Sequence, residues 1–257
     1  MRQLPRKQAI ISHFLLSLTI VLSLLAVIFF VWYPSPYFEI NGAGNVLRTL
    51  IGVDLVLGPV LTAILYKPGK KSLWFDMSFV AVVQLSALIY GATVLYQQRP
   101  EFMVFAVDRF VLVPRVNLYP SDEGVDEMCD LRWQGPCMVA AVMPDDPKQR
   151  EALMMLSLEQ RVELEQQAKY WRPLPDETAL VLRKARPLAV LADANEEADA
   201  AVESFVRRKG GAIADYKFLP VMNPRGQATT LILDAQTAKF TGVLSFDPWD
   251  ELERDDQ

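Results

Sequence analysis

Three long apolar runs dominate the first part of the chain. They lie at about residues 10–32, 47–66 and 73–96, and no charged residue occurs between Ala9 and Phe38. A helix of roughly 20 apolar residues is long enough to cross the hydrocarbon core of a bilayer. Three such helices inside a soluble protein would need a far larger core than the remaining residues can supply. The pattern therefore predicts a region of three transmembrane helices within residues 1–96, with the lipid bilayer as its surroundings.

The first apolar run predicts a retained anchor and not a cleaved signal peptide. A signal peptide has an apolar stretch of roughly 7–15 residues and then a cleavage site made of small residues. Here the run is longer and ends in Phe-Val-Trp-Tyr-Pro.

After residue 96 the pattern changes to shorter stretches with strand and helix signals, which predict an α+β domain over residues 97–257. Strand-like runs lie at 102–113, 216–221, 228–233 and 242–246, and the last two are predicted to form a hairpin. Helical patterns lie at 148–170, 176–184 and 195–209, with Asp176 and Asn195 as N-caps of the last two. The stretch 119–147 is rich in proline and acidic residues and predicts a loop.

Charge divides the chain at the same place and predicts its orientation. Residues 1–96 have a formal charge of +4 and residues 97–257 a charge of −9. Basic residues gather in the N-terminal tail and in the turn between the second and third apolar runs, at Arg2, Arg6, Lys7, Lys67, Lys70 and Lys71. Short cytoplasmic loops carry an excess of Lys and Arg. We therefore expect a cytoplasmic N-terminus and an extracytoplasmic domain at residues 97–257.

Aromatic residues near the ends of the runs fit this orientation, because Trp and Tyr gather at both membrane interfaces. The outer interface is predicted to hold Trp32, Tyr33, Tyr37, Tyr90 and Tyr96, and the inner one Tyr66 and Trp74.

The two cysteines of the chain lie close together in the predicted extracytoplasmic domain. Cys129 and Cys137 flank a seven-residue stretch that contains the turn signal Gly135-Pro136. In an oxidising compartment they can form a disulfide, and the alternative is a pair of reduced thiols in a loop. A zinc site is disfavoured because His13 is the only histidine. No metal and no cofactor are predicted.

Polar and small residues interrupt the second and third apolar runs at helical spacing. Asp54, Gly58 and Thr62 follow one another at i, i+4 and i+8. In the third run, an arc of about 80° on a helical wheel contains Asp76, Gln84, Ala87 and Gly91. Ionisable residues within membrane helices usually face protein or water and indicate function. Small residues let helices approach closely.

Two interpretations of these polar positions stay open. In the first, Asp54, Gly58, Thr62, Gln84, Ala87 and Gly91 form a docking surface for another membrane helix. In the second, Asp54 and Gln84 hydrogen-bond within the three-helix unit. For Asp76, an interaction with Lys70 and Lys71 at the cytoplasmic end of the helix is favoured over a role in docking.

Several function classes are disfavoured by the remaining sequence. No histidine, glycine-rich phosphate loop or nucleophile motif lies in residues 97–257, so we do not expect an enzyme. These residues also lack the dense basic patch that is typical of nucleic-acid binding. One alternative is kept: a membrane-anchored hydrolase of the cell envelope that uses carboxylates of the outer domain, which would need a pocket with two or more carboxylates of perturbed pKa.

Several motifs together resemble the TfpX/TfpZ family of type IV pilin accessory proteins. They are DLVLGPVLT (Asp54–Thr62), KPGKKSLWFDMS (Lys67–Ser78), Gln84, Tyr90-Gly91, RPEFMVFAVDRF (Arg99–Phe110) and LDAQTAKFTGVLSFDPW (Leu233–Trp249). The resemblance implies a protein of the inner membrane of a Gram-negative bacterium, with a periplasmic domain. Its implied partner is the type IV pilin, contacted at its transmembrane helix and periplasmic head. Its implied role is to support pilin stability or pilus assembly, and it implies no catalytic residues.

Overall fold

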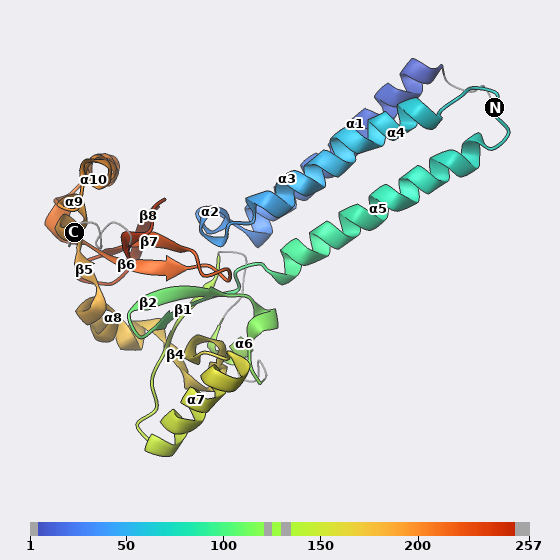
Figure 1. The fold of residues 1–257 in the computed structure, drawn as a ribbon. Coiled ribbons are helices and arrows are strands. Elements are labelled where there is room, and N and C mark those ends of the chain that lie inside the picture. Colours follow the sequence, from blue (N-terminus) through green and yellow to red (C-terminus); the bar gives the residue numbers. More distant parts are fainter. Residues whose placement is uncertain (1–4, 121–124, 130–134, 250–257) are drawn as a thin grey trace. The chain divides into compact units, whose positions relative to one another are not determined.

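The computed structural model describes residues 5–120, 125–129 and 135–249 of the chain. These residues divide into two compact units. One unit contains the chain up to Phe38 and Gly42–Arg99, and the other contains Glu39–Asn41 and the described residues from Pro100 onward. Figure 1 shows the helices of the first unit and the sheet of the second, with colours that follow the chain from blue to red.

The first unit contains three helices that are long and apolar enough to cross a membrane, at Arg6–Trp32, Gly44–Leu65 and Leu73–Gln97. The elements of this unit are α1 (Arg6–Val27), η1 (Ile28–Trp32), α3 (Gly44–Gly52), η2 (Val53–Leu57), α4 (Gly58–Leu65) and α5 (Leu73–Gln97). The short helix α2 (Tyr37–Asn41) is divided between the two units. This confirms the prediction of three long apolar helices, although the first begins four residues earlier than expected. Large apolar side chains such as Phe30, Trp74 and Ile89 are exposed on them.

The second of these helices contains a π-helical turn in its middle. In η2 the backbone N–H of Gly58 donates to the carbonyl of Val53, five residues earlier. Pro59 follows directly and has no N–H of its own, and its ring crowds the carbonyl four residues before it. A π-turn of this kind widens the helix at one place and is frequent at functional sites. The proline therefore accounts for the irregular turn that contains Asp54.

Tyr33, an aromatic residue of the predicted outer belt, is buried inside the bundle. Tyr33 is fully buried in a cluster with Ile28, Leu47 and Leu95, and its hydroxyl donates to the carbonyl oxygen of Leu95 at 2.7 Å. A buried tyrosine needs such a partner for its hydroxyl. This hydrogen bond satisfies the hydroxyl inside the bundle, and the position of Tyr33 at the membrane interface stays a prediction.

The second unit is built on an eight-stranded mixed sheet, which confirms the prediction of a domain of mixed helix and sheet. The strand order is β4-β3-β1-β2-β6-β7-β8, and β5 pairs with β6. The strands are β1 (Phe102–Ala106), β2 (Arg109–Val113), β3 (Cys137–Ala141), β4 (Trp171–Pro173), β5 (Arg186–Pro187), β6 (Tyr216–Met222), β7 (Ala228–Asp234) and β8 (Phe240–Leu244).

Hydrophobic clusters of described residues lie along this sheet, and one is found in each half. The helices of the unit are α6 (Val125–Met128), α7 (Pro147–Gln160), α8 (Thr178–Lys184), α9 (Leu188–Ala192) and α10 (Glu196–Lys209). Leu153 of α7 and Trp171 pack with β1, β2 and β3, while α9 and α10 pack with β6, β7 and β8. Between the two halves, β2 and β6 pair in parallel at only Phe110↔Val221 and Val111↔Met222. The sheet is therefore continuous between the two clusters.

The main correction to the predicted elements concerns β3. The stretch 119–147 was expected to be a loop, but Cys137–Ala141 is a strand that pairs in parallel with β1. Strands buried on both faces are short apolar runs without alternation. The proline-rich surroundings and the absence of alternation hid this strand from pattern analysis.

Two helix predictions also need correction. The helix expected at 148–170 ends at Gln160, where Arg161 adopts a left-handed conformation (φ 56°), and 3₁₀ turns follow at Leu164–Gln166 and Ala168–Tyr170. Asp176 is not an N-cap, because it lies inside the 3₁₀ turn Leu174–Glu177 before α8. The predicted cap Asn195 is confirmed, since its side-chain oxygen accepts from the N–H of Ala198 at 2.9 Å.

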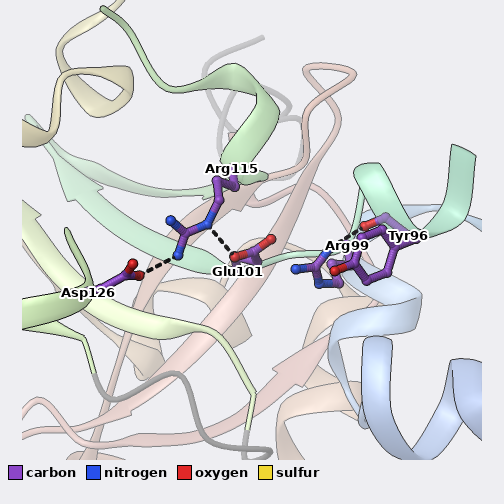
Figure 2. A network of polar contacts seen from close by, with 5 residues as sticks. All are labelled: Tyr96, Arg99, Glu101, Arg115 and Asp126. Atoms are coloured by element: carbon purple, nitrogen blue, oxygen red, sulfur yellow. Dashed lines mark hydrogen bonds and ion pairs between the residues drawn. The ribbon is translucent and has the colours of Figure 1, made fainter. Parts of the chain in front are cut away.

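Arg115 connects the start of β1 to α6. Figure 2 shows its guanidinium between Glu101, at 2.9 Å, and Asp126, at 2.7 Å. The Glu101 side chain is mostly buried, whereas Asp126 is exposed. Figure 2 also shows a contact within the first unit. The Arg99 guanidinium lies over the ring of Tyr96 and donates to the backbone carbonyl oxygen of Tyr96 at 2.8 Å.

We predict that Arg115→Met lowers the free energy of unfolding by about 1–3 kcal/mol, because the mostly buried Glu101 carboxylate loses a charged donor. Asp126→Ala is the matched control and is expected to cost less than about 0.5 kcal/mol, since exposed ion pairs contribute little. Thermal unfolding of the purified full-length protein measures both. Equal losses for the two variants would contradict the distinction between the buried and the exposed carboxylate.

Candidate functional site

The candidate site lies inside the first unit and centres on two buried polar side chains. Asp54 in η2 is 5% exposed and Gln84 in α5 is 7% exposed. Among the described residues, Asp54 Oδ2 and Gln84 Nε2 have no hydrogen-bond partner. Most buried polar atoms in proteins are hydrogen-bonded, and an unpaired one costs roughly 1–3 kcal/mol. Within the described residues, Asp54 thus has an unpaired acceptor and Gln84 an unpaired donor.

Gly58 brings the backbone of the second apolar helix close to these side chains. A Cβ atom at Gly58 would lie 2.0 Å from Gln84 Nε2 and 3.0 Å from His13 Nε2. Only glycine fits between α5 and α1 at this level, because any side chain would overlap the amide of Gln84. Nearby, Thr62 is 1% exposed and its Oγ1 lies 2.7 Å from His13 Nδ1, so a hydrogen bond joins α4 to α1.

Two grooves flank Asp54. The first, with a volume of about 240 Å³, is lined by residues of α1, η2 and α5 that include His13, Ser17, Asp54, Gln84 and Leu85. We call it the Gln84 groove. The second, with a volume of about 350 Å³, is lined by Asp54, Ala87 and Gly91 among others, and we call it the Gly91 groove. A Cβ at Gly91 would lie 2.9 Å from Leu50 Cδ1, so α5 and α3 also approach closely there.

Of the residues predicted from the sequence, Asp54 lines both grooves, whereas Gly58 and Thr62 line neither. Asp54, Gly58 and Thr62 are buried on the inner face of their helix, and Gln84 lies against Gly58. Ala87 and Gly91 belong to the Gly91 groove. Asp76 lines neither groove. It forms an ion pair with Lys70, in agreement with the favoured interpretation.

His13 was not predicted to be a member of this site. It was considered only as a metal ligand, yet its ring contacts Thr62 and lies near Gly58. A signal was available, because His13 and Ser17 are polar residues at i and i+4 within an otherwise apolar run. Both residues line the Gln84 groove.

In the second unit, Cys129 and Cys137 are joined by a disulfide bond. The bond connects the end of α6 to the first residue of β3 and closes a short loop. It lies beside the core of β1, β2 and β3, in which Cys129 is buried.

A groove of about 500 Å³ in the second unit bears on the alternative of a carboxylate hydrolase. It lies between α7 and the β1–β2 turn and includes Arg109, Met154, Glu163 and Glu165 in its lining. Burial raises the pKa of the Glu165 carboxyl. The Glu163 carboxylate accepts from Ser157 Oγ at 2.7 Å, and the Glu163 backbone N–H donates to Gln166 Oε1 at 2.8 Å. The groove therefore contains one half-buried carboxyl with a raised pKa, that of Glu165.

The raised pKa of Glu165 predicts a pH dependence of stability. Because burial disfavours the charged form, the folded protein holds this proton more tightly than the unfolded chain does. The free energy of unfolding therefore falls as pH rises from the unfolded pKa of about 4.3 through the folded pKa. Glu165→Gln removes this effect, so we expect the variant to gain stability relative to the natural protein between pH 4 and pH 7. Chemical unfolding across this range measures it, and a difference independent of pH would contradict it.

The described residues thus define a class of protein: three helices of membrane-spanning length, with a buried polar site, followed by a mixed helix-and-sheet domain. No group of three or more His, Cys, Asp and Glu side chains within the described ranges could hold a metal ion.

Comparison with known proteins gives the family. The model of "Fimbrial assembly protein FimB" matches residues 2–42. The fimbrial assembly protein of serogroup I from Dichelobacter nodosus is 30% identical over 238 residues, which are 90% of this chain and 91% of the relative. The protein of serogroup E1 is 29% identical over 236 residues, with the same coverage, and that of serogroups C1 and C2 is 46% identical over 108 residues, covering 41% of this chain and 82% of the relative. No solved structure matches significantly.

The chain therefore belongs to the family of fimbrial assembly proteins. Its relatives are named for assembly and not for an enzymatic activity. The resemblance noted in the sequence is thus confirmed at the level of fimbrial assembly.

Proposed function

We propose that this protein is an inner-membrane accessory factor of type IV pilus biogenesis, which binds its cognate pilin and supports the stability or assembly of that pilin. The family membership supports a role in fimbrial assembly. The single observation that carries the binding claim is the pair of buried, unpartnered polar atoms on Asp54 and Gln84. These atoms would gain hydrogen bonds from the transmembrane helix of a partner.

The proposed topology has three membrane crossings, a cytoplasmic N-terminus and a periplasmic domain. The exposed apolar side chains of the three helices support insertion, because so many of them in water would be strongly unfavourable. The lysines of the turn before α5 support its cytoplasmic side. The disulfide between Cys129 and Cys137 supports an oxidising compartment for the second unit.

This topology would let one accessory protein contact two parts of a pilin. In the proposed arrangement, the first unit holds the pilin helix within the bilayer and the second unit meets the pilin head in the periplasm. The polar site in the first unit makes the intramembrane contact specific, since lipid tails cannot satisfy a carboxylate or a carboxamide.

The experiment that tests the proposal is recovery of pilin with the tagged protein from solubilised membranes. We expect pilin in the eluate of the natural protein and a clear reduction for a variant that carries Asp54→Ala and Gln84→Ala. Abundance and membrane insertion of each variant serve as controls. Undiminished recovery of pilin with a normally inserted double variant would defeat the docking claim.

A deletion strain separates the two possible roles. Pilin is quantified in the membrane fraction and in the sheared surface fraction. Loss from both fractions indicates support of pilin stability, whereas loss only from the surface fraction indicates support of assembly. Unchanged pilin in both fractions would contradict the proposed function.

A further inference from the structure

The two grooves beside Asp54 differ in what they offer to a partner. Asp54 and Gln84 both line the Gln84 groove, and each has an unpartnered polar atom, an acceptor on Asp54 and a donor on Gln84. The Gly91 groove is lined by Asp54 but not by Gln84. The lining residues of the first groove therefore offer two unpartnered polar atoms to a partner helix, and those of the second offer one.

The chemistry of the two atoms narrows the group that can occupy the site. The Asp54 carboxylate oxygen accepts a hydrogen bond and the Gln84 amide nitrogen donates one. An ammonium or guanidinium group only donates, and a carboxylate only accepts, so neither satisfies both atoms. A hydroxyl or a carboxamide does both. It is also neutral, and so it is far less costly than a charge to carry into a bilayer on a helix.

From these observations we infer that the Gln84 groove is the seat of the partner's transmembrane helix, and that this helix inserts a hydroxyl or carboxamide side chain between Asp54 and Gln84. The inference rests on the proposed function and deepens it, because it assigns the groove and the chemistry of the contact. His13 and Thr62 act as positioning residues, since their hydrogen bond holds α1 against α4 at the edge of the groove.

The geometry of α5 allows the two grooves to be tested separately. Leu85 lies in the Gln84 groove and Tyr90 in the Gly91 groove, and both side chains are exposed. Phe79 is exposed on the same helix and lines neither groove. A photo-crosslinking amino acid placed at each of the three positions in turn therefore reports which side of α5 the pilin helix occupies.

We expect pilin crosslinks from position 85 and few from positions 79 and 90. The crosslinked pilin segment should contain a Ser, Thr, Asn or Gln within one helical turn. Gln84→Leu should lower pilin recovery about three- to tenfold, the range of a single hydrogen bond between membrane helices. Replacing the identified pilin residue by leucine should lower it similarly, and the two changes together should lower it no further than one alone.

Several results would overturn the inference. Stronger crosslinks from position 90 would assign the pilin to the Gly91 groove while leaving the proposed function intact. Crosslinks from position 85 to lipid alone, or additive effects of the two leucine substitutions, would also reject it. If the natural protein recovers no pilin at all, the proposed function itself fails, which distinguishes that failure from an error in the groove.

Discussion

Gly58→Leu is expected to reduce recovery of pilin with the tagged protein about tenfold or more. A side chain at Gly58 cannot be accommodated without movement, since even a Cβ would lie 2.0 Å from Gln84 Nε2. The leucine must push α4 away from α5 and displace both Gln84 and His13, and overpacking of this kind typically costs 1–3 kcal/mol. Quantitative immunoblotting of pilin in the eluate, normalised to the accessory protein, measures the effect.

Gly52→Leu is the matched control for this prediction. Gly52 belongs to the same long apolar helix, and a Cβ there would meet no atom within 4 Å. We therefore expect normal abundance and nearly normal pilin recovery. If both leucine variants lose pilin equally, the close approach at Gly58 is not the cause, and the site defined by Gly58 and Gln84 would be rejected.

The second large effect is expected from removal of the disulfide. Replacing Cys129 and Cys137 together by alanine should lower the free energy of unfolding by about 2.5 kcal/mol, because the bond closes a short loop that is open in the unfolded variant. For a domain of this size, the loss corresponds to a fall in Tm of roughly 5–10 °C. Thermal unfolding of the purified full-length protein measures it.

A reducing agent provides the internal control for the disulfide. Dithiothreitol should destabilise the natural protein by a similar amount and leave the double alanine variant unchanged. Thiol labelling in intact cells adds a test of topology, because a domain in the periplasm should hold both cysteines in the oxidised form. Free thiols in the natural protein would contradict both the bond and the proposed location.

The large features of the first unit could be predicted from the sequence because they depend on local properties. Length and apolar composition determine whether a helix can span a bilayer, and spacing along the helix determines that Asp54, Gly58 and Thr62 share a face.

In the second unit, the cap at Asn195 and the strands of residues 102–113 and 216–233 were likewise predicted, since local side-chain hydrogen bonding and β-branched composition favour them. The strand β3 was missed, because pairing with β1 and burial on both faces make it a strand, and neither has a local signature.

What the sequence by itself determined is which segments are apolar enough for the bilayer, where the charge changes, and which residues can face one another on one helix. Only the tertiary structure decided that Gln84 lies against Gly58, that His13 bonds to Thr62, and that Ala87 and Gly91 line a separate groove. The physical reason is that spacing specifies the face of a single helix, while contacts between helices depend on their rotation and separation. These are set here by the π-turn before Pro59 and by the close approach at Gly58.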